Sequence, residues 1–453
     1  MGIRNSIVTT LGLFSTYLAA DCYALPRPQG RQALVTTPSI PDGHWIDTWA
    51  AMPQLTEYTN LPPPPYNTTT NQFFNSTIRQ TLHMSTGASQ IRIRISNAFG
   101  LTDLPITAMT VALPSNGSSG DSAILPSTLQ SVTFSGGEAG ITIPDGALAV
   151  SDPLNFPVKP LQTITVTLYL ATGQNGTYIT SHPGSRATSW FTMGNQVGAT
   201  NLTGPLLNST AHWYFLSAVE AWSPRDYRTW AIIGDSITDG RGSDTDKNNR
   251  WPDLVYARIA ASNSTSLTGL SFINQAAGGN RILYDGNGPN VLSRVDRDVL
   301  AHPAVKYAMI FEGVNDIGTG ATTAENQTYI YNRLISAYRQ IATRIHDFGI
   351  PLFAATITPF SAPGNNVTLQ AYSSPIREQT RQKVNSFIRT SGIFDAVFDF
   401  DALLRNQSVP SQLADALQSG DYLHPNEKGY QLIADTFDLS VFDKFQAGVT
   451  GFI

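Results

Sequence analysis

The patterning of apolar residues changes character near Tyr227, and this change divides the chain into two parts of different fold class. Before it, apolar and polar residues alternate with a period of two, as at Ile91, Ile93 and Ile95, which is typical of strands with one buried face. Residues 164–170 repeat the pattern, and turn clusters rich in Gly, Pro and Asn separate the runs. Residues 43–226 are therefore predicted to form an antiparallel β-sandwich domain.

After Tyr227, short apolar segments alternate with longer helical patterns. Strands are expected at 229–233, 270–274, 307–312, 352–357 and 396–398, and helices at 251–261, 329–348, 376–390 and 427–437. This alternation predicts a parallel sheet covered on both faces, so residues 227–453 are assigned to a flavodoxin-like, doubly wound α/β domain. Such sheets bind their ligands at the carboxyl ends of the strands.

The first residues of the chain predict export from the cell. Arg4 precedes a mostly apolar stretch, 7–20, that has the length of a signal-peptide core and is short for a membrane span of about 20 residues. Residues 1–24 are interpreted as a signal peptide, with cleavage after either Ala20 or Ala24, and 25–42 as a flexible leader rich in Pro, Gln and Thr. A plain N-terminal helix is the alternative.

Asn-x-Ser/Thr sequons add to the expectation of a secreted, extracellular glycoprotein. Ten are present, at Asn67, Asn75, Asn116, Asn175, Asn201, Asn208, Asn263, Asn326, Asn366 and Asn406. The single cysteine, Cys22, lies beside the expected cleavage point, so no internal disulfide framework is expected. A chain of 453 residues with 41% apolar residues can bury a sufficient core without one.

Charge and motifs exclude several other classes of function. A net charge of −5 without a basic run argues against a nucleic-acid partner. No later segment reaches 18 uninterrupted apolar residues, so an integral membrane protein is not expected. His-Glu-x-x-His, paired cysteines and the Gly-rich nucleotide loop are absent from the sequence, so neither a metal nor a cofactor is expected.

The most specific chemical signal is the segment 233–240, Ile-Gly-Asp-Ser-Ile-Thr-Asp-Gly. An apolar strand runs directly into Gly-Asp-Ser, which places Ser236 where a strand turns toward a helix. That position exposes the hydroxyl group and directs backbone N–H groups at a developing oxyanion. The segment differs from the Gly-x-Ser-x-Gly elbow because Thr238 replaces the second glycine. On this segment alone, a helix-capping role for Ser236 is an equal alternative.

A serine hydroxyl needs a base that removes its proton, and seven histidines are available. His424 follows the last predicted strand, and Asp421 precedes it by three residues, so the carboxylate can orient one ring nitrogen and leave the other for Ser236. A surface loop with a His-Pro turn is the alternative. The remaining histidines are interpreted as packing, surface, helix-end or turn residues: His44, His83, His182, His212, His302 and His346.

Two further segments that follow predicted strands could stabilise an oxyanion. In 274–280, Gly279 can present its N–H without obstruction by a side chain, and in 312–316 the amide of Asn315 is a suitable donor. Each segment, considered alone, is better explained as a strand-to-loop turn than as part of a site.

Taken together and in this order, the segments resemble the GDSL, or SGNH, family of serine hydrolases. The resemblance lies in Gly-Asp-Ser at 234–236, in Gly279, in Gly-Val-Asn-Asp at 313–316 and in Asp-Tyr-Leu-His at 421–424. It implies that Ser236 is the nucleophile, that His424 is the base and that Asp421 orients it. It also implies an oxyanion hole made by the amides of Ser236 and Gly279 and by the side chain of Asn315. Gly279 is preferred to Gly278 as the oxyanion donor because Asn280 adjoins it. The first motif departs from the family at one position, where Ile237 replaces Leu.

The first part of the chain has a looser resemblance of its own. Trp45-x-x-x-Trp49, Ile-Arg-Gln at 78–80 and Arg-x-Ser-Asn-Ala-Phe-Gly at 94–100 look like the leading β-domain of some secreted members of this family. Those members are grouped with xylan esterases and other carbohydrate esterases.

The resemblance implies hydrolysis of carboxylic esters through an acyl-enzyme. Secretion, the sequons and the β-domain favour short acyl groups, such as acetyl, on plant polysaccharide. A lipase or general carboxylesterase acting on longer chains is the first alternative, and a non-catalytic carbohydrate-binding glycoprotein is the second. A glycosidase would need paired carboxylates, and we interpret the closest pair, Asp399 and Asp401, as structural or loop residues.

Overall fold

A computed structural model describes residues 37–451 of the chain. The expected signal peptide and most of the expected leader lie outside the described residues. The described part of the leader, 37–42, is fixed along the β-sheet structure that follows it. The Gln90 side chain bonds the backbone of Thr37 at 2.7 Å and of Ser39 at 2.8 Å, and the indole of Trp222 donates to the Ile40 carbonyl at 2.9 Å.

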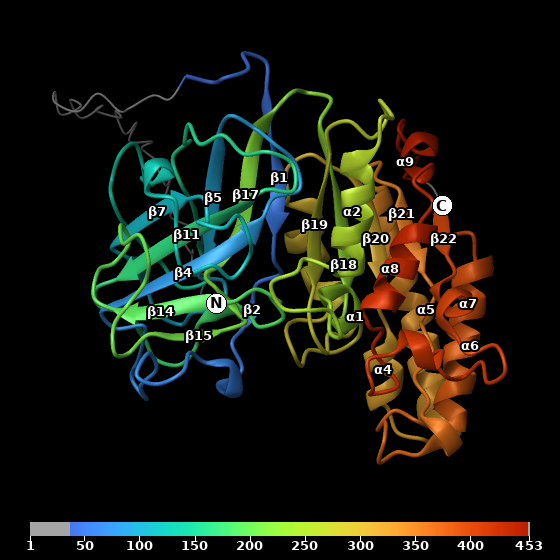
Figure 1. The fold of residues 1–453 in the computed structure, drawn as a ribbon. Helices are drawn as coiled ribbons and strands as arrows, with labels where there is room; N and C mark the ends of the chain where they lie inside the picture. The colour runs from blue at the N-terminus through green and yellow to red at the C-terminus, as the bar shows by residue number, and fades with distance from the viewer. Residues whose placement is uncertain (1–36, 452–453) are drawn as a thin grey trace, which may run out of the picture. The chain divides into compact units, whose positions relative to one another are not determined.

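Two antiparallel sheets pack face to face in the first half of the described chain, which we call the β region (Figure 1). The smaller sheet has the order β1 (His44–Ala50), β17 (Leu216–Ser223), β5 (Ile91–Ser96) and β10 (Leu148–Val150). The larger has the order β15 (Asn208–Thr210), β14 (Ser189–Met193), β4 (Ser76–His83), β11 (Thr163–Leu170), β7 (Ala108–Ala112) and β8 (Gln130–Val132). The predicted antiparallel β-sandwich is confirmed.

Short strands at the edge of the sandwich carry residues that matter below. β16 (Trp213–Tyr214), β13 (Thr180–His182) and β2 (Gln54–Leu55) form a small sheet. β12 (Gln174–Asn175) pairs with β3 (Asn71–Gln72), and β6 (Leu104–Ile106) pairs with β9 (Ile141–Ile143).

The alternation in β5 has the expected result, because Ile91, Ile93 and Ile95 are completely buried in the core between the two sheets. On β11 both faces are buried, since Thr167 is also covered. Arg79 explains this: its guanidinium donates to the Thr167 hydroxyl at 3.1 Å and to the carbonyls of two overlying loops, at Ser122 and Ala199. The loops therefore replace solvent on that face.

The second half of the described chain, which we call the α/β region, contains one sheet with the order β19 (Leu270–Ala276), β18 (Arg228–Gly234), β20 (Val305–Phe311), β21 (Leu352–Ala355) and β22 (Ala396–Phe398). All its strand pairs are parallel. Numbered within this region, the order is 2-1-3-4-5, as in flavodoxin-like folds. The predicted fold class is confirmed, and each predicted strand overlaps an observed one.

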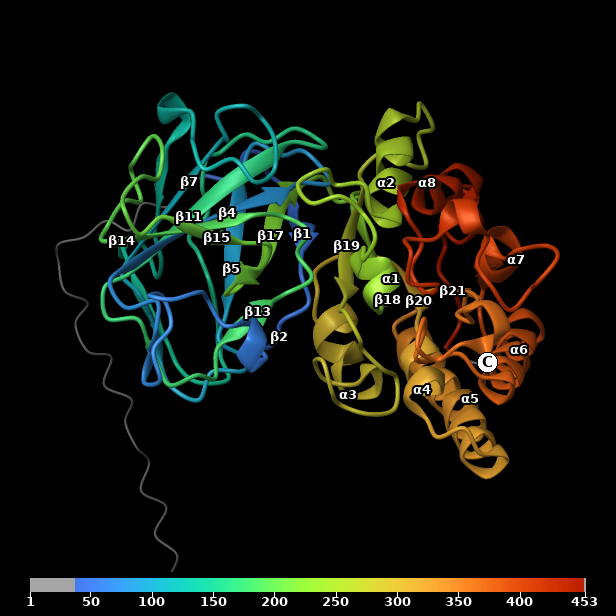
Figure 2. The ribbon, with the colours of Figure 1, turned by 60° about the horizontal axis from the view of Figure 1, so that its bottom comes forward.

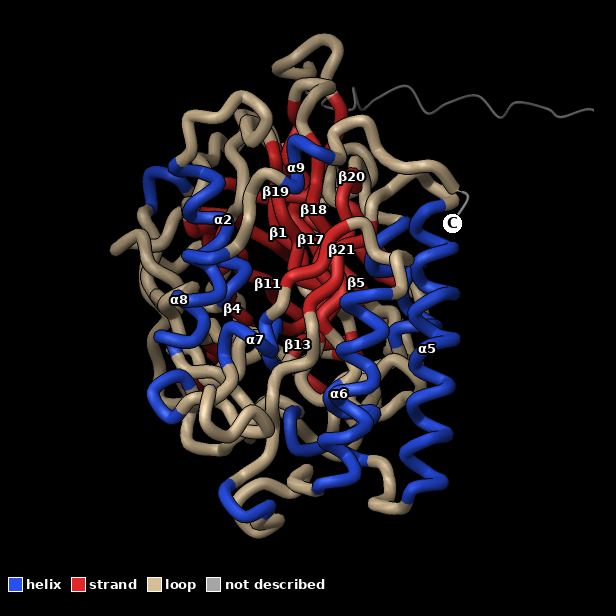
Figure 3. Tube along the Cα trace, turned by 90° about the vertical axis from the view of Figure 1, so that its right-hand side faces the viewer, coloured by secondary structure: helices blue, strands red, loops and turns tan. Residues whose placement is uncertain are grey.

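Helices cover both faces of this sheet (Figure 3). On one face lie α5 (Ala324–His346) and α6 (Pro375–Thr390), with the short α3 (Val291–Val295) and α4 (Val314–Thr319). On the other lie α2 (Trp251–Ala261), α8 (Glu427–Thr436), α7 (Phe400–Leu404) and α9 (Val441–Lys444). Because both faces are covered, neighbouring strand residues such as Ala231 and Ile232 belong to different cores. In the described chain, no helix has the length and apolarity needed to cross a bilayer.

The predicted helices are found with small shifts at their ends. α2 has the expected bounds, whereas α5 begins at Ala324, before the predicted start at residue 329. The hydroxyl of Thr323 accepts the Asn326 N–H and caps the helix, which adds a polar first turn that apolar periodicity does not reveal.

The β region lies against β19, the outer strand of the parallel sheet (Figure 2). Ala51 forms a parallel bridge with Asn274, and the Ser85 hydroxyl donates to the Phe272 carbonyl at 3.3 Å. Asp47 on β1 accepts from His302 at 2.8 Å. An open strand edge is thereby covered, and the two regions form one compact unit.

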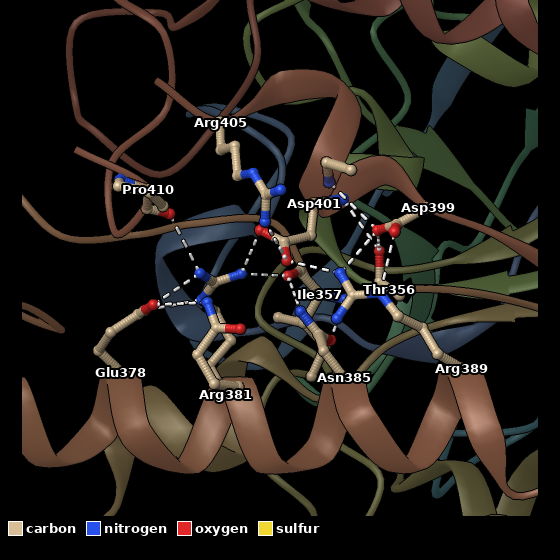
Figure 4. A network of polar contacts seen from close by, with 12 residues as sticks. Thr356, Ile357, Glu378, Arg381, Asn385, Arg389, Asp399, Asp401, Arg405 and Pro410 are labelled. Carbon is tan, nitrogen blue, oxygen red and sulfur yellow. Dashed lines mark hydrogen bonds and ion pairs between the residues drawn. The ribbon is translucent and has the colours of Figure 1, made fainter. Parts of the chain in front are cut away.

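A buried ionic network fastens α6 to the turn after β22 (Figure 4). Arg381 is fully buried and bonds Asp401 at 2.7 Å and Glu378 through two nitrogens, both at 2.7 Å. Arg389 bridges Asp399 and Asp401, with both distances 2.7 Å. Asp399 and Asp401 therefore have structural partners, as interpreted from the sequence.

Removal of Arg381 should destabilise the fold more than removal of Arg389. Arg381→Met removes a partner from the buried Asp401 and from the half-buried Glu378, and it should lower the free energy of unfolding by about 3–5 kcal/mol. Arg389 is 29% exposed, so Arg389→Met should cost clearly less. Urea unfolding followed by circular dichroism measures both variants, and equal losses would contradict the assignment of the network to Arg381.

Candidate active site

Ser236 follows the carboxyl end of the interior strand β18, as the first residue of the short helix α1 (Ser236–Asp239). Asp235 caps this helix by accepting the Ile237 N–H at 2.9 Å. A side chain at Gly234 would come within 2.5 Å of Thr238, so glycine is needed for the tight turn. The N–H of Ser236, at the first helical position, has no acceptor within the helix.

The structure brings Ser236, His424 and Asp421 together in a hydrogen-bonded line. The Ser236 Oγ lies 2.7 Å from the His424 Nε2, and the His424 Nδ1 lies 2.6 Å from an oxygen of Asp421. The other Asp421 oxygen accepts the backbone N–H groups of Leu423 and His424 at 3.0 and 2.9 Å. Tyr422, between Asp421 and Leu423, has a φ of +57°, a left-handed conformation that folds the loop back on itself.

The surroundings set the charges of the histidine and the aspartate. Burial lowers the pKa of His424, and the Asp421 carboxylate only partly opposes this effect. Burial would raise the pKa of Asp421, but the hydrogen bonds from the ring and backbone of His424 hold it well below its usual range. Near pH 7 the ring is therefore neutral, with its proton on Nδ1 facing Asp421 and its lone pair on Nε2 facing Ser236.

Gly279 lies in the loop after β19, with φ +72. The neighbouring Gly278 N–H donates to Asp239 at 3.0 Å, whereas the Gly279 N–H has no hydrogen bond among the described residues. A side chain at Gly279 would come within 2.5 Å of Asn287. Both its conformation and the lack of space thus favour glycine, and its N–H is free to bind a ligand.

Asn315 lies in the first turn of α4, directly after β20 and the left-handed Gly313. Its Nδ2 donates to the Asn280 carbonyl at 2.9 Å, and its Oδ1 accepts from the Tyr372 hydroxyl at 2.9 Å. These two bonds fix the orientation of the amide and leave its second N–H available. Tyr372 has no motif in the sequence and is a positioning residue that sequence reasoning missed.

A cavity of about 500 Å³ opens above these residues. Ser236, His424, Gly279 and Asn315 all line it. The α/β region also contributes Asp239, Arg241, Gly278, Asn287, Tyr372 and Leu423 to the lining, and the β region contributes Gln54, Glu57, Thr59, Asn60, Pro183, Gly184, Arg186 and His212. The cavity is therefore shared by both regions and is mainly polar.

Two histidines of the β region, interpreted from the sequence as packing or surface residues, lie at the site or next to it. His212 lines the cavity, and His182 is buried with its Nε2 2.9 Å from Asp239, a neighbour of the site. Nothing local in the sequence marks them, because their relation to the site arises only when the β region packs on the α/β region.

Three carboxyl groups are buried beneath the site. Burial raises the pKa of Asp235 to about 7 and that of Asp316 to about 6, and it raises the pKa of Glu312 well above its usual range. Asp316 accepts the N–H groups of Ile282 and Leu283 at 2.9 and 3.0 Å, which fixes the loop that carries Gly279. In the described part of the chain, no group of three or more His, Cys, Asp or Glu side chains is arranged to hold a metal ion.

Residues 231–437 match the family described as GDSL-like lipase/acylhydrolase. The matched stretch runs from β18 through α8 and includes Ser236, Gly279, Asn315, Asp421 and His424. The doubly wound fold and this match define a carboxylic ester hydrolase. The α/β region of the chain belongs to the GDSL, or SGNH, family of esterases.

Solved structures with limited similarity cover about half of the chain. A carbohydrate acetylesterase from Sinorhizobium meliloti is 14% identical, with 49% of this chain and 99% of that chain covered and a TM-score of 0.35. An acetyl xylan esterase is 18% identical, with coverages of 46% and 96% and a TM-score of 0.34. A GDSL-like lipase from Bacteroides thetaiotaomicron VPI-5482 is 16% identical, with coverages of 48% and 88% and a TM-score of 0.33. No curated protein sequence matches the chain.

The pKa of His424 should lie below the ordinary histidine value of about 6.5. Asp421→Asn should lower this pKa further, because it removes the charge that favours the imidazolium. Nuclear magnetic resonance of protein labelled with ¹³C-histidine can follow the titration, with His424→Gln to assign the signal. A value at or above 6.5 in the wild type would contradict the assigned effect of burial.

Proposed function

We propose that the protein hydrolyses short-chain carboxylic esters, such as acetyl groups, on a polar carbohydrate alcohol, with Ser236 as nucleophile. The observation that carries the proposal is the line from Ser236 through His424 to Asp421, which opens into a polar cavity. Sequence, family and geometry all support the same set of residues.

The geometry is suited to a two-step reaction. His424 accepts the Ser236 proton at Nε2 while the serine oxygen attacks the carbonyl carbon of the ester. Asp421 stabilises the resulting imidazolium. The imidazolium then protonates the leaving alcohol, an acyl-enzyme remains, and a water molecule activated by His424 releases the acid.

The negative charge that develops on the carbonyl oxygen of the tetrahedral intermediate requires hydrogen-bond donors that point at this oxygen. The N–H groups of Ser236 and Gly279 and the second N–H of Asn315 are the proposed oxyanion hole. All three residues line the same cavity, and none of the three donors has another acceptor among the described residues.

The lining of the cavity supports a short acyl group and a polar alcohol. Leu423 and Pro183 are its aliphatic side chains, and Tyr372 adds an aromatic ring. A palmitoyl chain would need an extended apolar channel to leave water favourably, at about 0.8 kcal/mol per buried methylene group. The amide, hydroxyl and charged groups of the lining suit a sugar, so acylated polysaccharide, for example acetylated xylan or pectin, is the proposed substrate class.

We also propose that the protein acts outside the cell as a glycoprotein. Support comes from the apolar stretch at 7–20 and from the positions of the ten sequons, all of which lie in the described chain. None of the ten asparagines is buried. Five are exposed, at Asn116, Asn175, Asn201, Asn263 and Asn366.

Ser236→Ala should abolish ester cleavage while it preserves the fold. Release of p-nitrophenol from the acetate and palmitate esters by purified wild type and variant tests both the nucleophile and the chain length. We expect the wild type to cleave the acetate at least about 10³-fold faster than the variant and to prefer it to the palmitate.

Preference for palmitate would instead support the lipase or general carboxylesterase. Absence of cleavage above the variant's background, for both esters and for acetylated xylan and pectin, would overturn the esterase proposal in favour of a carbohydrate-binding role.

Arg186 should recognise the alcohol portion of the substrate. It lines the cavity, has φ +49, and its buried Nε has no hydrogen-bond partner within the described structure. Strained backbone and an unpaired donor at a cavity are typical of residues kept for binding.

Arg186→Gln should therefore raise KM for acetylated oligosaccharide by about tenfold, the loss of one charge-assisted hydrogen bond. The kcat for p-nitrophenyl acetate, which lacks the sugar, should change by less than about twofold at pH 8, where His424 is neutral in both proteins. Equal effects on the two substrates would contradict this assignment.

A further inference from the structure

Asp239 connects the β region to the loop that carries the proposed oxyanion donor Gly279. It is the last residue of α1, is 1% exposed and lies three residues after Ser236. One carboxylate oxygen lies 2.9 Å from His182 Nε2, and the other accepts the Gly278 N–H at 3.0 Å. Each oxygen of a single carboxylate thus contacts a different region of the molecule.

His182, on β13, has a polar partner at each ring nitrogen. Its Nδ1 lies 3.0 Å from the Met52 carbonyl, which can only accept, and its Nε2 faces the Asp239 carboxylate, which accepts as well. The ring stacks on Trp213 at 5.8 Å with an interplanar angle of 28°, which fixes its plane.

The backbone next to His182 also encloses the carboxylate. A side chain at Gly184 would come within 1.7 Å of the Asp239 oxygen that binds Gly278. The β region therefore contacts Asp239 both through the His182 ring and through the bare backbone of Gly184, and it leaves the carboxylate a single position.

We propose that His182 is a positioning residue for the oxyanion hole and acts through Asp239 and Gly278 on the N–H of Gly279. The inference rests on the proposed function of this site. Asp239 holds the Gly278 N–H, which leaves Gly279 as the donor that faces the cavity. His182 holds Asp239 in place through its Nε2, and Asp239 in turn holds the loop that presents the Gly279 N–H to the oxyanion.

The role gives the β region a part in the chemical step itself. An oxyanion donor contributes only in the transition state, so its displacement lowers kcat and leaves KM little changed. A role limited to holding the two regions together would lower the amount of folded protein and leave the kcat of the folded fraction unchanged.

The test compares His182→Phe with His302→Phe on p-nitrophenyl acetate. Phenylalanine at 182 keeps the ring next to Trp213 but removes both polar contacts. His302 is a matched control, because it also joins the two regions through a carboxylate, Asp47 at 2.8 Å, yet it does not line the cavity.

We expect His182→Phe to lower kcat by about 10- to 100-fold, short of the full loss of a donor, with KM within about threefold of wild type. His302→Phe should keep kcat, per folded molecule, within about twofold. A kcat within twofold of wild type for His182→Phe, or an equal loss for His302→Phe, would overturn the proposal.

Asp239→Asn keeps a hydrogen-bond acceptor for Gly278 but removes the carboxylate. It also serves as a second variant if His182→Phe does not fold. The amide oxygen can still accept the Gly278 N–H, and the amide nitrogen can donate to a neutral His182 ring. Asp239→Asn should therefore retain most of kcat, whereas Asp239→Leu, without an acceptor, should lose as much as His182→Phe. Equal kcat in the two Asp239 variants would contradict the proposed path, and an inactive wild type would overturn the proposed function as well.

Discussion

Parallel pairing of three neighbouring strands is the constraint on which the site depends. Gly234 at the end of β18 lies level with Ala276 on β19 and with Phe311 on β20. The three chains therefore leave the sheet at one height, and Ser236, Gly279 and Asn315 follow within two to four residues of these partners. A shift of one residue in either pairing would turn every side chain to the opposite face and separate the proposed nucleophile from the proposed oxyanion donors.

The second constraint is the covered edge of that sheet. β19 would present unpaired backbone groups to solvent if the β region did not lie against it. The same packing brings residues from the β2, β13 and β16 segments over the site, among them Arg186 and His212. One interface thus covers the edge of the sheet and forms a wall of the cavity.

The sequence predicted those features that local pattern determines. Strand and helix periods identified both fold classes, and the turns after strands identified Ser236, Gly279 and Asn315, because in a parallel sheet such turns must gather at one edge. Contacts between distant segments gave no such signal. His182 and Asp239 are far apart in the chain, Tyr372 fixes Asn315 from a loop before α6, and the burial of Thr167 depends on loops that Arg79 holds over β11. These features require the packed structure.

The buried carboxyl groups under the site make the free energy of unfolding depend on pH. Because burial raises the pKa of Asp235 to about 7 and that of Asp316 to about 6, the folded chain holds protons at these two groups that the unfolded chain releases above about pH 4. Their contribution to the free energy of unfolding therefore falls as the pH rises from about 4 to 7. The buried acids beneath the candidate site thus favour the folded protein in mildly acidic surroundings.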